Sequence, residues 1–581
     1  ELLIAAGVQP GSLVGLSVQR DVDLPVALVG IMKAGAGYFP LDPTYPRQRL
    51  EFMISDVFGA GSASVVLVSA ATREAIPAPD GVTLLCLDDA EVQAELAKDA
   101  AGVPLPVPHP DDPMYLVFTS GSTGVPKGVL GTHRSMSARL NWQIAHYPVT
   151  GEDIRLAQSS MTFLEGGMEM LAGLAAGATL ILADDNEFRN PEALARLIVD
   201  ERVAQVTAVA SLISVLAESD GTLRGLRRLV CSGEPVSADL LARLGTALDP
   251  TAALLNNFGA TETSGAAVRG ELEPPTPKLG RPTPGSAAYV LDDALQPVPP
   301  GVVGEVYYAG PQIVRGYWKR PGLTSTRFVA NPFSTTAGDR LYRSGDRARW
   351  SVDGVLEFVG RTDHQVKVRG FRVELAEVEA ALRAASGVAS AAARTWEQRG
   401  VTTLAGYLVP ADPVDDVAAF IAAVRAEVAA VLPGYMVPAS LTVLEALPLT
   451  DSGKLNRPAL PQPAVATRGE SDPAVTPTEK TLVGICAELL GLEAIGRSDG
   501  FFELGGDSIL SVQLAARARA AGLDVDPRMI FEHPTFGELA AAVDASESTP
   551  QAADTAFEPM SVSGLSSDAL ADLTAAWGDS P

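Results

Sequence analysis

The sequence predicts a multidomain α/β protein with a large N-terminal core of β-sheets and helices, a small α+β lobe and a helical C-terminal unit. Length is the first observation, because 581 residues correspond to three or four domains at about 150 residues each. Composition is the second, since 47% hydrophobic against 20% charged residues supplies packed cores and excludes a mostly disordered chain. The third is a change of pattern along the chain, from alternating strand-like and helix-like runs to Ala-rich helices and then a Pro-rich linker.

The charge balance and the cysteines exclude several classes of protein. The 44 basic and 70 acidic residues give a net charge of −26, so we expect no nucleic-acid partner. Three widely separated cysteines fit neither a disulfide framework nor a zinc site. The longest uncharged run, Met170–Ala183, is too short to span a bilayer, so we expect no membrane partner. No signal peptide is recognisable, which favours a cytoplasmic protein, and a start at Glu1 rather than Met favours a piece of a longer chain.

Alternating runs up to about residue 360 predict a core with mostly parallel sheets. Short β-rich runs are separated by amphipathic helical patterns, as expected where a crossover helix follows each strand. Later strands are closer together, and Asp353-Gly354 between two valines predicts a hairpin. The β-rich runs are Met114–Thr119, Thr179–Ala183, Val206–Val209, Leu226–Cys231 and Leu254–Phe258, and the helical patterns are Pro191–Glu201 and Ser237–Leu248.

The remainder of the chain predicts four further segments. Amphipathic helices at Glu374–Ala384 and Val414–Val431, with a strand at Thr403–Val409, indicate a separate lobe. In the tail, Leu570, Leu573 and Trp577 share one helical face, which fits a frayed helix as well as a docking element. The predicted boundaries are 1–362 for an N-terminally truncated core, 363–460 for the lobe, 461–475 for a linker, 476–545 for the helical unit and 546–581 for the tail.

A loop rich in Gly, Ser and Thr follows the β-rich run Met114–Thr119 and predicts a phosphate site. Its backbone N–H groups, hydroxyls and one lysine can all face phosphate oxygens. The spacing is not that of a P-loop NTPase, because Lys127 is followed by Gly128. An ordinary surface turn does not require three hydroxyl residues and a lysine among glycines. The candidate residues are Thr119, Ser120, Gly121, Thr123, Gly124 and Lys127.

This loop resembles the signature of the adenylate-forming superfamily, which includes acyl-CoA synthetases, luciferases and the adenylation domains of nonribosomal peptide synthetases. The resemblance covers residues 1 to about 460 and implies the superfamily's large α/β core, without some 40 residues that normally begin it. Further segments match in the same order along the chain, and they make the resemblance far more specific than one motif. They are Ala34–Asp42, Asn257–Thr263, Gly304–Val306, Val314–Trp318, Tyr342–Asp346, Gly360–Gly370 and Pro448–Lys454.

The resemblance implies attack of a carboxylate on the α-phosphate of ATP. Two anions must meet, so the site needs cations and dipoles at the developing charge. It implies that Thr119, Ser120, Thr123 and Lys127 hold the β- and γ-phosphates, that Glu262 binds Mg²⁺ and that Thr261 contacts the α-phosphate. It also implies that Asp346 and Arg361 bind the ribose, that Gly233, Glu234, Asn257 and Phe258 frame the adenine, that Lys454 is the catalytic lysine and that Asp363 is the hinge of the small lobe.

The helical unit contains Asp499–Ile509, which resembles the 4'-phosphopantetheine site of peptidyl carrier proteins, in these synthetases a four-helix bundle. Ser508 stands where a helix N-cap is expected, which by itself would explain a serine there. The resemblance instead implies that Ser508 bears the arm, attached by a phosphopantetheinyl transferase, whose thiol accepts the acyl group. The form Gly-Gly-Asp-Ser favours a partner other than an ordinary condensation domain.

The substrate pocket departs from the family pattern. Leu164 stands where amino-acid-activating members carry the Asp that pairs with the α-ammonium, and an unpaired buried ammonium costs several kcal/mol. A standard α-amino acid is therefore disfavoured. Glu165 either receives an amine displaced from the α-carbon, as in a β-amino acid, or faces outward around a plain carboxylic acid. A one-residue shift of the alignment would instead put Glu165 in the usual role of the Asp. The pocket residues implied by the resemblance are Phe163, Leu164, Glu165, Met168, Thr207, Val230, Ser232, Asn257, Gly265 and Ala266.

Together these observations predict an adenylation–carrier segment of a peptide synthetase that loads an unusual amino or carboxylic acid onto Ser508. The expected partners are other synthetase domains, such as condensation or tailoring domains, and an MbtH-like activator. An acyl-CoA synthetase-like ligase is the alternative enzyme, although the attached carrier disfavours it. A catalytically silent scaffold is the alternative of another class, and intact Lys127, Glu262, Asp346 and Lys454 disfavour it.

Overall fold

A computed structural model describes most of the chain from residue 1 to residue 546. The tail helix expected near Trp577 lies outside the described residues, as do Ser122, His364 and Ser452 of the predicted motifs. The described ranges are 1–59, 64–98, 104–121, 123–149, 153–219, 221–273, 277–363, 365–368, 370–398, 401–451, 453–463, 472–490, 492, 495–501, 504, 506, 508–526, 529–530, 533 and 535–546.

The first sheet has seven strands in the order β16-β6-β5-β2-β1-β3-β4. Its strands from β5 to β4 are parallel, and β6 and β16 add to one edge in antiparallel fashion. The strands are β1 (Leu13–Ser17), β2 (Gly37–Pro40), β3 (Ser64–Val68), β4 (Val82–Cys86), β5 (Pro113–Thr119), β6 (Lys127–Thr132) and β16 (Gly316–Tyr317), joined by α2 (Asp23–Lys33), α3 (Arg47–Val57), α4 (Ala70–Arg73) and α5 (Ala90–Leu96) after a short α1 (Leu2–Ala5).

The second sheet has the order β13-β12-β11-β10-β9-β7-β8 and is parallel from β11 to β8. Its strands are β7 (Ile154–Ala157), β8 (Thr179–Leu182), β9 (Gln205–Ala208), β10 (Arg228–Ser232), β11 (Ala253–Phe258), β12 (Val268–Glu271) and β13 (Arg281–Pro282). The helices around them are α6 (His133–His146), α7 (Leu164–Ala176), α8 (Asp185–Arg189), α9 (Pro191–Asp200), α10 (Ala210–Leu216) and α11 (Ala238–Ala247).

A third sheet closes the core, and two small sheets form the lobe after it. The third sheet is antiparallel in the order β14-β15-β18-β17, with β19 paired to β18. It comprises β14 (Ala287–Leu291), β15 (Gly304–Ala309), β17 (Phe328–Ala330), β18 (Arg340–Trp350) and β19 (Leu356–Arg361), with α12 (Pro321–Arg327) beside it. The lobe comprises β20 (Gln365–Val368), β21 (Phe371–Glu374), α13 (Leu375–Ala384), β22 (Val388–Gln398), β23 (Val401–Pro410), α14 (Val417–Ala429) and β24 (Ser440–Val443).

Helix α7 packs on the first sheet because its sequence lets it approach closely. Tyr38 and Tyr115 of that sheet share one buried apolar cluster with Met168 and Leu171 of the helix. A methyl group on Gly167 would lie 2.2 Å from the Tyr38 hydroxyl, so only glycine fits there. This packing fixes the start of α7, and with it Leu164 and Glu165, between the two large sheets.

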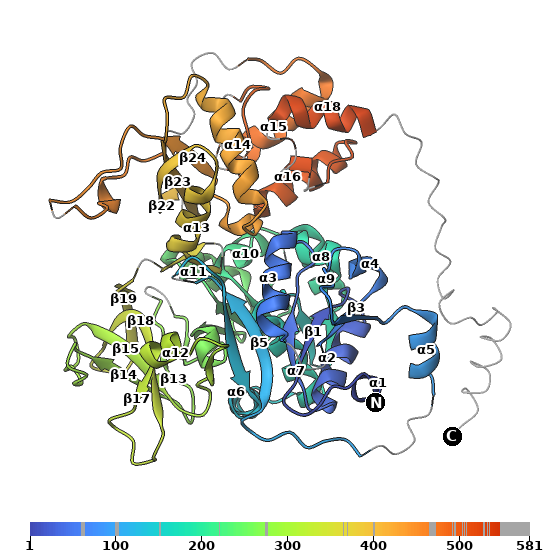
Figure 1. The fold of residues 1–581 in the computed structure, drawn as a ribbon, viewed down its shortest axis with the longest axis vertical. Helices are drawn as coiled ribbons and strands as arrows, with labels where there is room; N and C mark the ends of the chain where they lie inside the picture. Colours follow the sequence, from blue (N-terminus) through green and yellow to red (C-terminus); the bar gives the residue numbers. More distant parts are fainter. Residues whose placement is uncertain are drawn as a thin grey trace.

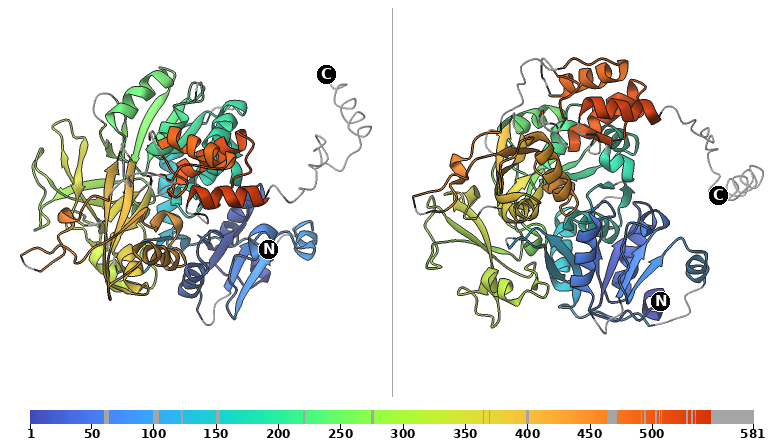
Figure 2. Two further views of the ribbon diagram at one scale, coloured as in Figure 1. Left: turned by 90° about the horizontal axis from the view of Figure 1, so that it is seen from above. Right: turned by 45° about the horizontal axis from the view of Figure 1, so that its top comes forward.

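The carrier region folds around its own apolar core. Helices α15 (Pro477–Leu490), α16 (Ser508–Ala520) and α18 (Phe536–Ser546) pack through buried side chains such as Leu482, Leu514 and Phe536. Figures 1 and 2 show these helices beside the core, where α16 lies against α9. In the described part of the chain, no helix has the length and apolarity needed to cross a bilayer.

The predicted fold class is confirmed, and most predicted elements match within a few residues. The strand expected at Leu226–Cys231 is shifted to Arg228–Ser232, because Leu226 instead packs in the apolar cluster below the sheet. The helix expected from Val414 begins at Val417, where the Asp416 side chain caps the Ala419 N–H at 3.0 Å.

Candidate functional site

A cavity of about 160 Å³ lies where the carboxyl ends of strands from both large sheets meet the lobe. Open α/β sheets bind ligands at this position. The predicted residues that line it are Thr119, Ser120, Phe163, Leu164, Glu165, Ser232, Gly233, Asn257, Phe258, Thr261, Gly265, Asp346 and Arg361.

The phosphate loop contacts the lobe in this structure. The Ser120 hydroxyl donates to the Arg372 carbonyl at 2.7 Å and accepts the Glu374 N–H at 3.1 Å. The Gly121 N–H donates to Glu377 Oε2 at 2.8 Å, so a carboxylate stands where the loop is predicted to hold a phosphate oxygen. Thr119 Oγ1 is buried, has no hydrogen-bond partner among the described residues, and belongs to a residue that lines the cavity.

Lys127 is the buried cation of this loop. Its Nζ lies 3.5 Å from Glu374 Oε1, and both side chains are 7% exposed. Burial and the nearby Arg372 lower the pKa of Lys127, whereas Glu262 and Glu374 oppose that shift. Thr123 and Gly124 are described but do not line the cavity.

Glu262, in the short 3₁₀ turn Thr261–Thr263 after β11, is fully buried with both carboxylate oxygens engaged. Oε1 accepts from the Tyr317 hydroxyl at 2.8 Å, and Oε2 accepts from Arg372 Nη1 at 2.7 Å. Burial alone would raise the pKa of Glu262, but Arg372, Lys127 and Tyr317 outweigh it and hold that pKa at about 2. The group is therefore an ionised carboxylate at any working pH.

Asp346, on β18, and Arg361, on β19, form a second polar cluster. The two strands pair Asp346 directly opposite Arg361, which places their side chains in an ion pair. Arg361 also donates to Asp363 at 2.7 Å through Nε, so the predicted ribose residues and the predicted hinge share one guanidinium. Burial raises the pKa of Asp346, and Arg361 and Lys367 oppose that shift.

The end of the cavity predicted for the acyl group has Leu164 and Glu165 side by side at the start of α7. Glu165 therefore lines the cavity rather than facing outward, and the class of acid bound there stays a prediction. A methyl group on Gly265 would lie 3.6 Å from Leu164 Cδ2 and 3.7 Å from Glu165 Oε2, so both side chains reach this part of the cavity. Burial raises the pKa of Glu165, and Arg139 opposes that shift.

Several predicted residues do not line the cavity. Met168, Val230, Thr207 and Ala266 are buried behind its wall, and the Glu234 carboxylate caps α10 by accepting the Ser211 N–H at 2.7 Å. Lys454 is exposed on a turn closed by a bridge between Leu449 and Leu455, so this arrangement does not bring it to the cavity.

Lobe residues that the sequence analysis did not single out complete the lining. Phe371 stacks on Tyr435 at 3.8 Å and contacts Phe163 at 4.8 Å between ring centroids. Lys367 lies 5.2 Å from the centroid of the Phe258 ring. Lys367 lies in the matched segment Gly360–Gly370, and Phe371 follows it directly. The sequence pattern does not indicate, however, that this segment lines the cavity.

The residues present fit the implied cofactors. Mg²⁺ takes one or two carboxylates and completes its shell with phosphates and water, so one carboxylate beside the predicted phosphate loop suffices for it. Glu262 stays the predicted ligand for it: the carboxylate is ionised, and in this structure its Oε2 accepts from Arg372. Ser508 is the first residue of α16, the position implied for attachment of 4'-phosphopantetheine.

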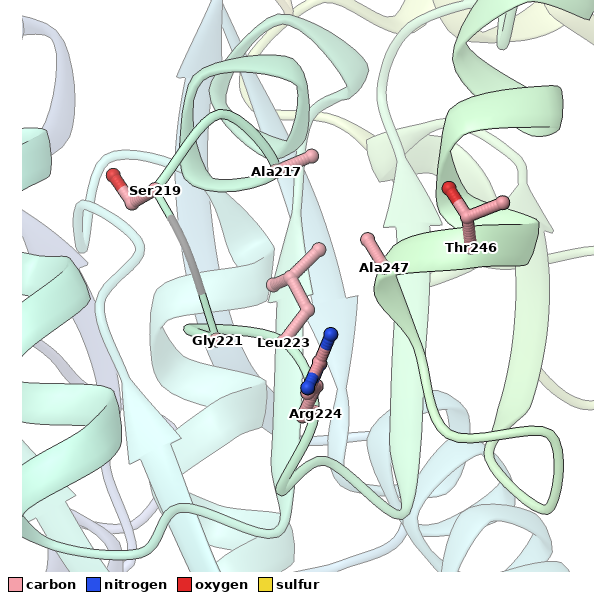
Figure 3. Close-up of a pocket in the computed structure, with 7 residues that line it drawn as sticks. All are labelled: Ala217, Ser219, Gly221, Leu223, Arg224, Thr246 and Ala247. Atoms are coloured by element: carbon pink, nitrogen blue, oxygen red, sulfur yellow. The ribbon is translucent and has the colours of Figure 1, made fainter.

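A second cavity, of about 180 Å³, lies between α10 and α11 (Figure 3). Small and apolar side chains such as Ala217, Leu223 and Ala247 surround it, and Arg224 is the one charged residue among its seven lining residues. None of its lining residues belongs to the polar groups described above, and none is a carboxylate.

Comparisons with known proteins agree with this geometry. Residues 1–318 match the family described as AMP-binding enzyme, residues 377–454 its C-terminal domain, and residues 480–543 the phosphopantetheine attachment site. The chain is 39% identical over 565 residues to phosphinothricin tripeptide synthetase PhsB of Streptomyces viridochromogenes and 38% identical over 567 residues to a dimodular nonribosomal peptide synthase of Bacillus subtilis. These alignments cover 95% and 96% of the chain, which spans only 46% and 23% of the two relatives.

A solved structure is similar to most of the chain. It is holo-PA1221, described as an NRPS protein containing adenylation and PCP domains bound to a vinylsulfonamide inhibitor. The TM-score is 0.75 at 25% identity, covering 94% of this chain and 90% of that one.

Proposed function

The chain belongs to the AMP-binding enzyme family and carries a phosphopantetheine attachment site, and from this we propose that it is an adenylation–carrier segment of a nonribosomal peptide synthetase. In this role it activates an amino or carboxylic acid with ATP as an acyl-AMP and transfers the acyl group to the arm on Ser508. The arm is attached by a phosphopantetheinyl transferase.

One observation supports this function above the others. A single cavity brings together the phosphate loop, the Asp346–Arg361 pair and the start of α7, and the same chain carries its own acceptor region. A silent scaffold does not require a buried, ionised Glu262 or a buried Lys127 in that loop. A CoA ligase does not require a carrier.

The proposed chemistry has two steps. A carboxylate oxygen of the substrate attacks the α-phosphorus of ATP, the bond to the β-phosphate breaks and pyrophosphate leaves. Mg²⁺, when bound, neutralises phosphate charge. Thr119, Ser120 and Lys127 orient the phosphates, and Asp346 accepts hydrogen bonds from the ribose. In the second step the carrier thiol attacks the acyl carbon, a C–S bond forms, the C–O bond to phosphate breaks, AMP leaves and the thiol proton passes to solvent.

The lobe orientation in this structure fits the second step. Arg372 donates a hydrogen bond to Glu262, the carboxylate proposed to bind Mg²⁺. Glu377 accepts the N–H of Gly121, a group of the loop proposed to bind phosphate. Lys454, the proposed catalytic lysine of the first step, is exposed instead. We propose that the lobe rotates about Asp363 between the steps, exchanging Lys454 for the segment from Lys367 to Arg372.

We propose that the substrate is non-standard, with Glu165 receiving an amine that is not on the α-carbon. Leu164 and Glu165 both line the end of the cavity that we assign to the acyl group. The Glu165 side-chain carboxylate therefore lies one residue after Leu164, which holds the position of the family's Asp. A β-amino acid has its amine displaced in a comparable way. Other synthetase domains and an MbtH-like activator are the proposed protein partners.

ATP–pyrophosphate exchange tests the function and the substrate class. β-Alanine, β-lysine and other β-amino acids are offered beside their α isomers, and we expect stronger exchange with the β-amino acids. Stronger exchange with the α isomers contradicts the proposed substrate. Transfer to free CoA as efficiently as to the holo carrier favours a CoA ligase, and no exchange with any acid favours a scaffold.

A further inference from the structure

A cationic region lies next to Glu165, which lines the cavity and interacts electrostatically with Arg139. Arg139 on α6 is 3% exposed, and its Nε and Nη1 are buried without a hydrogen-bond partner in the described part of the chain. Arg269 on β12 likewise has a buried Nε without a partner. Buried guanidinium groups normally form ion pairs or hydrogen bonds, because a buried unpaired charge destabilises the fold.

The sheet register places Arg269 on the face that lines the cavity. In β10 and β11, Ser232 lies beside Asn257, and both line the cavity. Asn257 pairs directly with Arg269 across the antiparallel β11–β12 ladder, and such cross-strand partners project from the same face. The Asn257 side chain also has a buried Oδ1 for which the described residues supply no partner.

The end of α6 covers the same face. Trp142 and Tyr147 pack with Val230 and Leu255, each two residues before Ser232 and Asn257 on their strands and therefore on the same side of the sheet. Arg139 lies 4.6 Å from the centroid of the Trp142 ring, and Arg269 lies 4.0 Å from that of Tyr147. The two arginines thus flank one aromatic pair on the sheet face that also carries Ser232 and Asn257.

Charge is not balanced in this region. Glu165 is the carboxylate that acts on Arg139, and Glu271, on the exposed end of β12, acts on Arg269. Burial and the neighbouring Arg139 together lower the pKa of Arg269 to about 10, so Arg269 carries its charge at neutral pH. Arg139 is treated as charged as well, because a guanidinium stays protonated in proteins. Glu169, the next carboxylate along α7, already accepts hydrogen bonds from the Gln158 and Ser159 N–H groups and the Ser159 hydroxyl. A net positive charge therefore remains if Glu165 binds a substrate amine.

We propose that the acid activated by this chain carries a second, negatively charged group at its far end, a carboxylate or an equivalent oxyanion, which binds Arg139 and Arg269 beyond Glu165. This inference rests on the proposed function and names the substrate class of its acyl pocket. The activated carboxylate lies at the phosphate end, an amine pairs with Glu165, and the distal anion compensates the two guanidinium groups. Asn257 Oδ1 and the Tyr147 hydroxyl, which lack a partner within the described ranges, supply further polar contacts.

Four acids of equal chain length test the amine and the distal carboxylate of the substrate separately. They are 3-aminopentanedioic acid, 3-aminopentanoic acid, pentanedioic acid and pentanoic acid, offered singly in ATP–pyrophosphate exchange to the whole chain. We expect each diacid to exceed its monoacid in kcat/KM by about 10–100-fold, as hydrogen bonds to a charged group would give. Equal or better use of the monoacids overturns the inference.

Arg139→Met tests the assignment of the residue, and Arg134→Met is its control. Arg134 lies on the same helix but is exposed and paired with Asp111 at 2.8 Å. We expect Arg139→Met to remove the diacid preference while leaving exchange with the monoacids, and Arg134→Met to keep the preference. An equal loss for both acid types would give Arg139 only a structural role and contradict the assignment. Arg269→Met provides the same comparison if the first variant does not fold.

The two possible failures are distinguishable. If no acid from a broad pool supports exchange, the proposed function fails and the inference fails with it. If monoacids are activated and diacids are not, the proposed function stands and the inference alone is wrong.

Discussion

Replacing Arg49 by methionine is expected to slow transfer of the acyl group to the carrier while leaving adenylation intact. Arg49 lies on α3 in the core, and its Nη1 donates to Glu377 Oε1 of the lobe at 2.9 Å, with side chains 4% and 2% exposed. The other Glu377 oxygen accepts the Gly121 N–H. The variant therefore leaves a buried carboxylate without its cation whenever the lobe adopts this orientation.

The magnitude follows from that burial. Removing one partner of a buried ion pair costs about 3–5 kcal/mol, because the remaining charge is uncompensated. Since each 1.4 kcal/mol is a factor of ten, the orientation shown here loses at least about 100-fold in population. The orientation proposed for adenylation does not use this pair, so it is unaffected.

Two assays on one preparation measure the difference. Single-turnover loading of the holo carrier is expected to slow by at least about 100-fold, whereas ATP–pyrophosphate exchange stays within a few-fold of wild type. Arg47→Met is the matched control, because Arg47 lies on the same helix in an exposed pair with Glu51 that contributes little. Unchanged loading, or equal loss in both assays, would refute the reasoning.

Three further predictions concern single residues. Lys454→Ala is expected to lose about 10²–10³ in exchange, because it removes a preorganised cation from the adenylation step, and near-wild-type exchange excludes that role. Ser508→Ala is expected to keep exchange but gain no mass from a phosphopantetheinyl transferase; a mass gain would place the arm elsewhere. The pKa of Glu262 is lowered from 4.5 to about 2, so the stability it contributes is present above about pH 4.5 and is lost as pH falls toward 2. Between pH 5 and pH 3, Tm is therefore expected to fall more in wild type than in Glu262→Gln, and parallel curves contradict this.

The sequence predicted the core well because its signals are local. Strand-like runs such as Met114–Thr119 carry the β-rich residues of buried parallel strands, and the glycine-rich loop after them is set by short-range backbone requirements. The same holds for the acidic residue in the turn after β11, since its place depends on that strand.

What the sequence could not predict depends on contacts between distant segments. Arg372 and Glu377 reach Glu262 and Gly121 across more than 100 residues, and neither contact leaves a periodic pattern. The burial of Arg139 could not be predicted either, because a charged residue on an amphipathic helix normally faces solvent. Only the packing of α6 against the second sheet shows that this arginine is buried.

Peptide-level mass spectrometry of the holo chain tests the central claim most directly. The chain is incubated with ATP, Mg²⁺ and a pool of acids, and AMP released is measured beside the acyl mass on the peptide containing Ser508. We expect one AMP for each acyl group loaded, with the added mass on that peptide alone. Absence of AMP with every acid, or an acyl group attached elsewhere, would contradict the account.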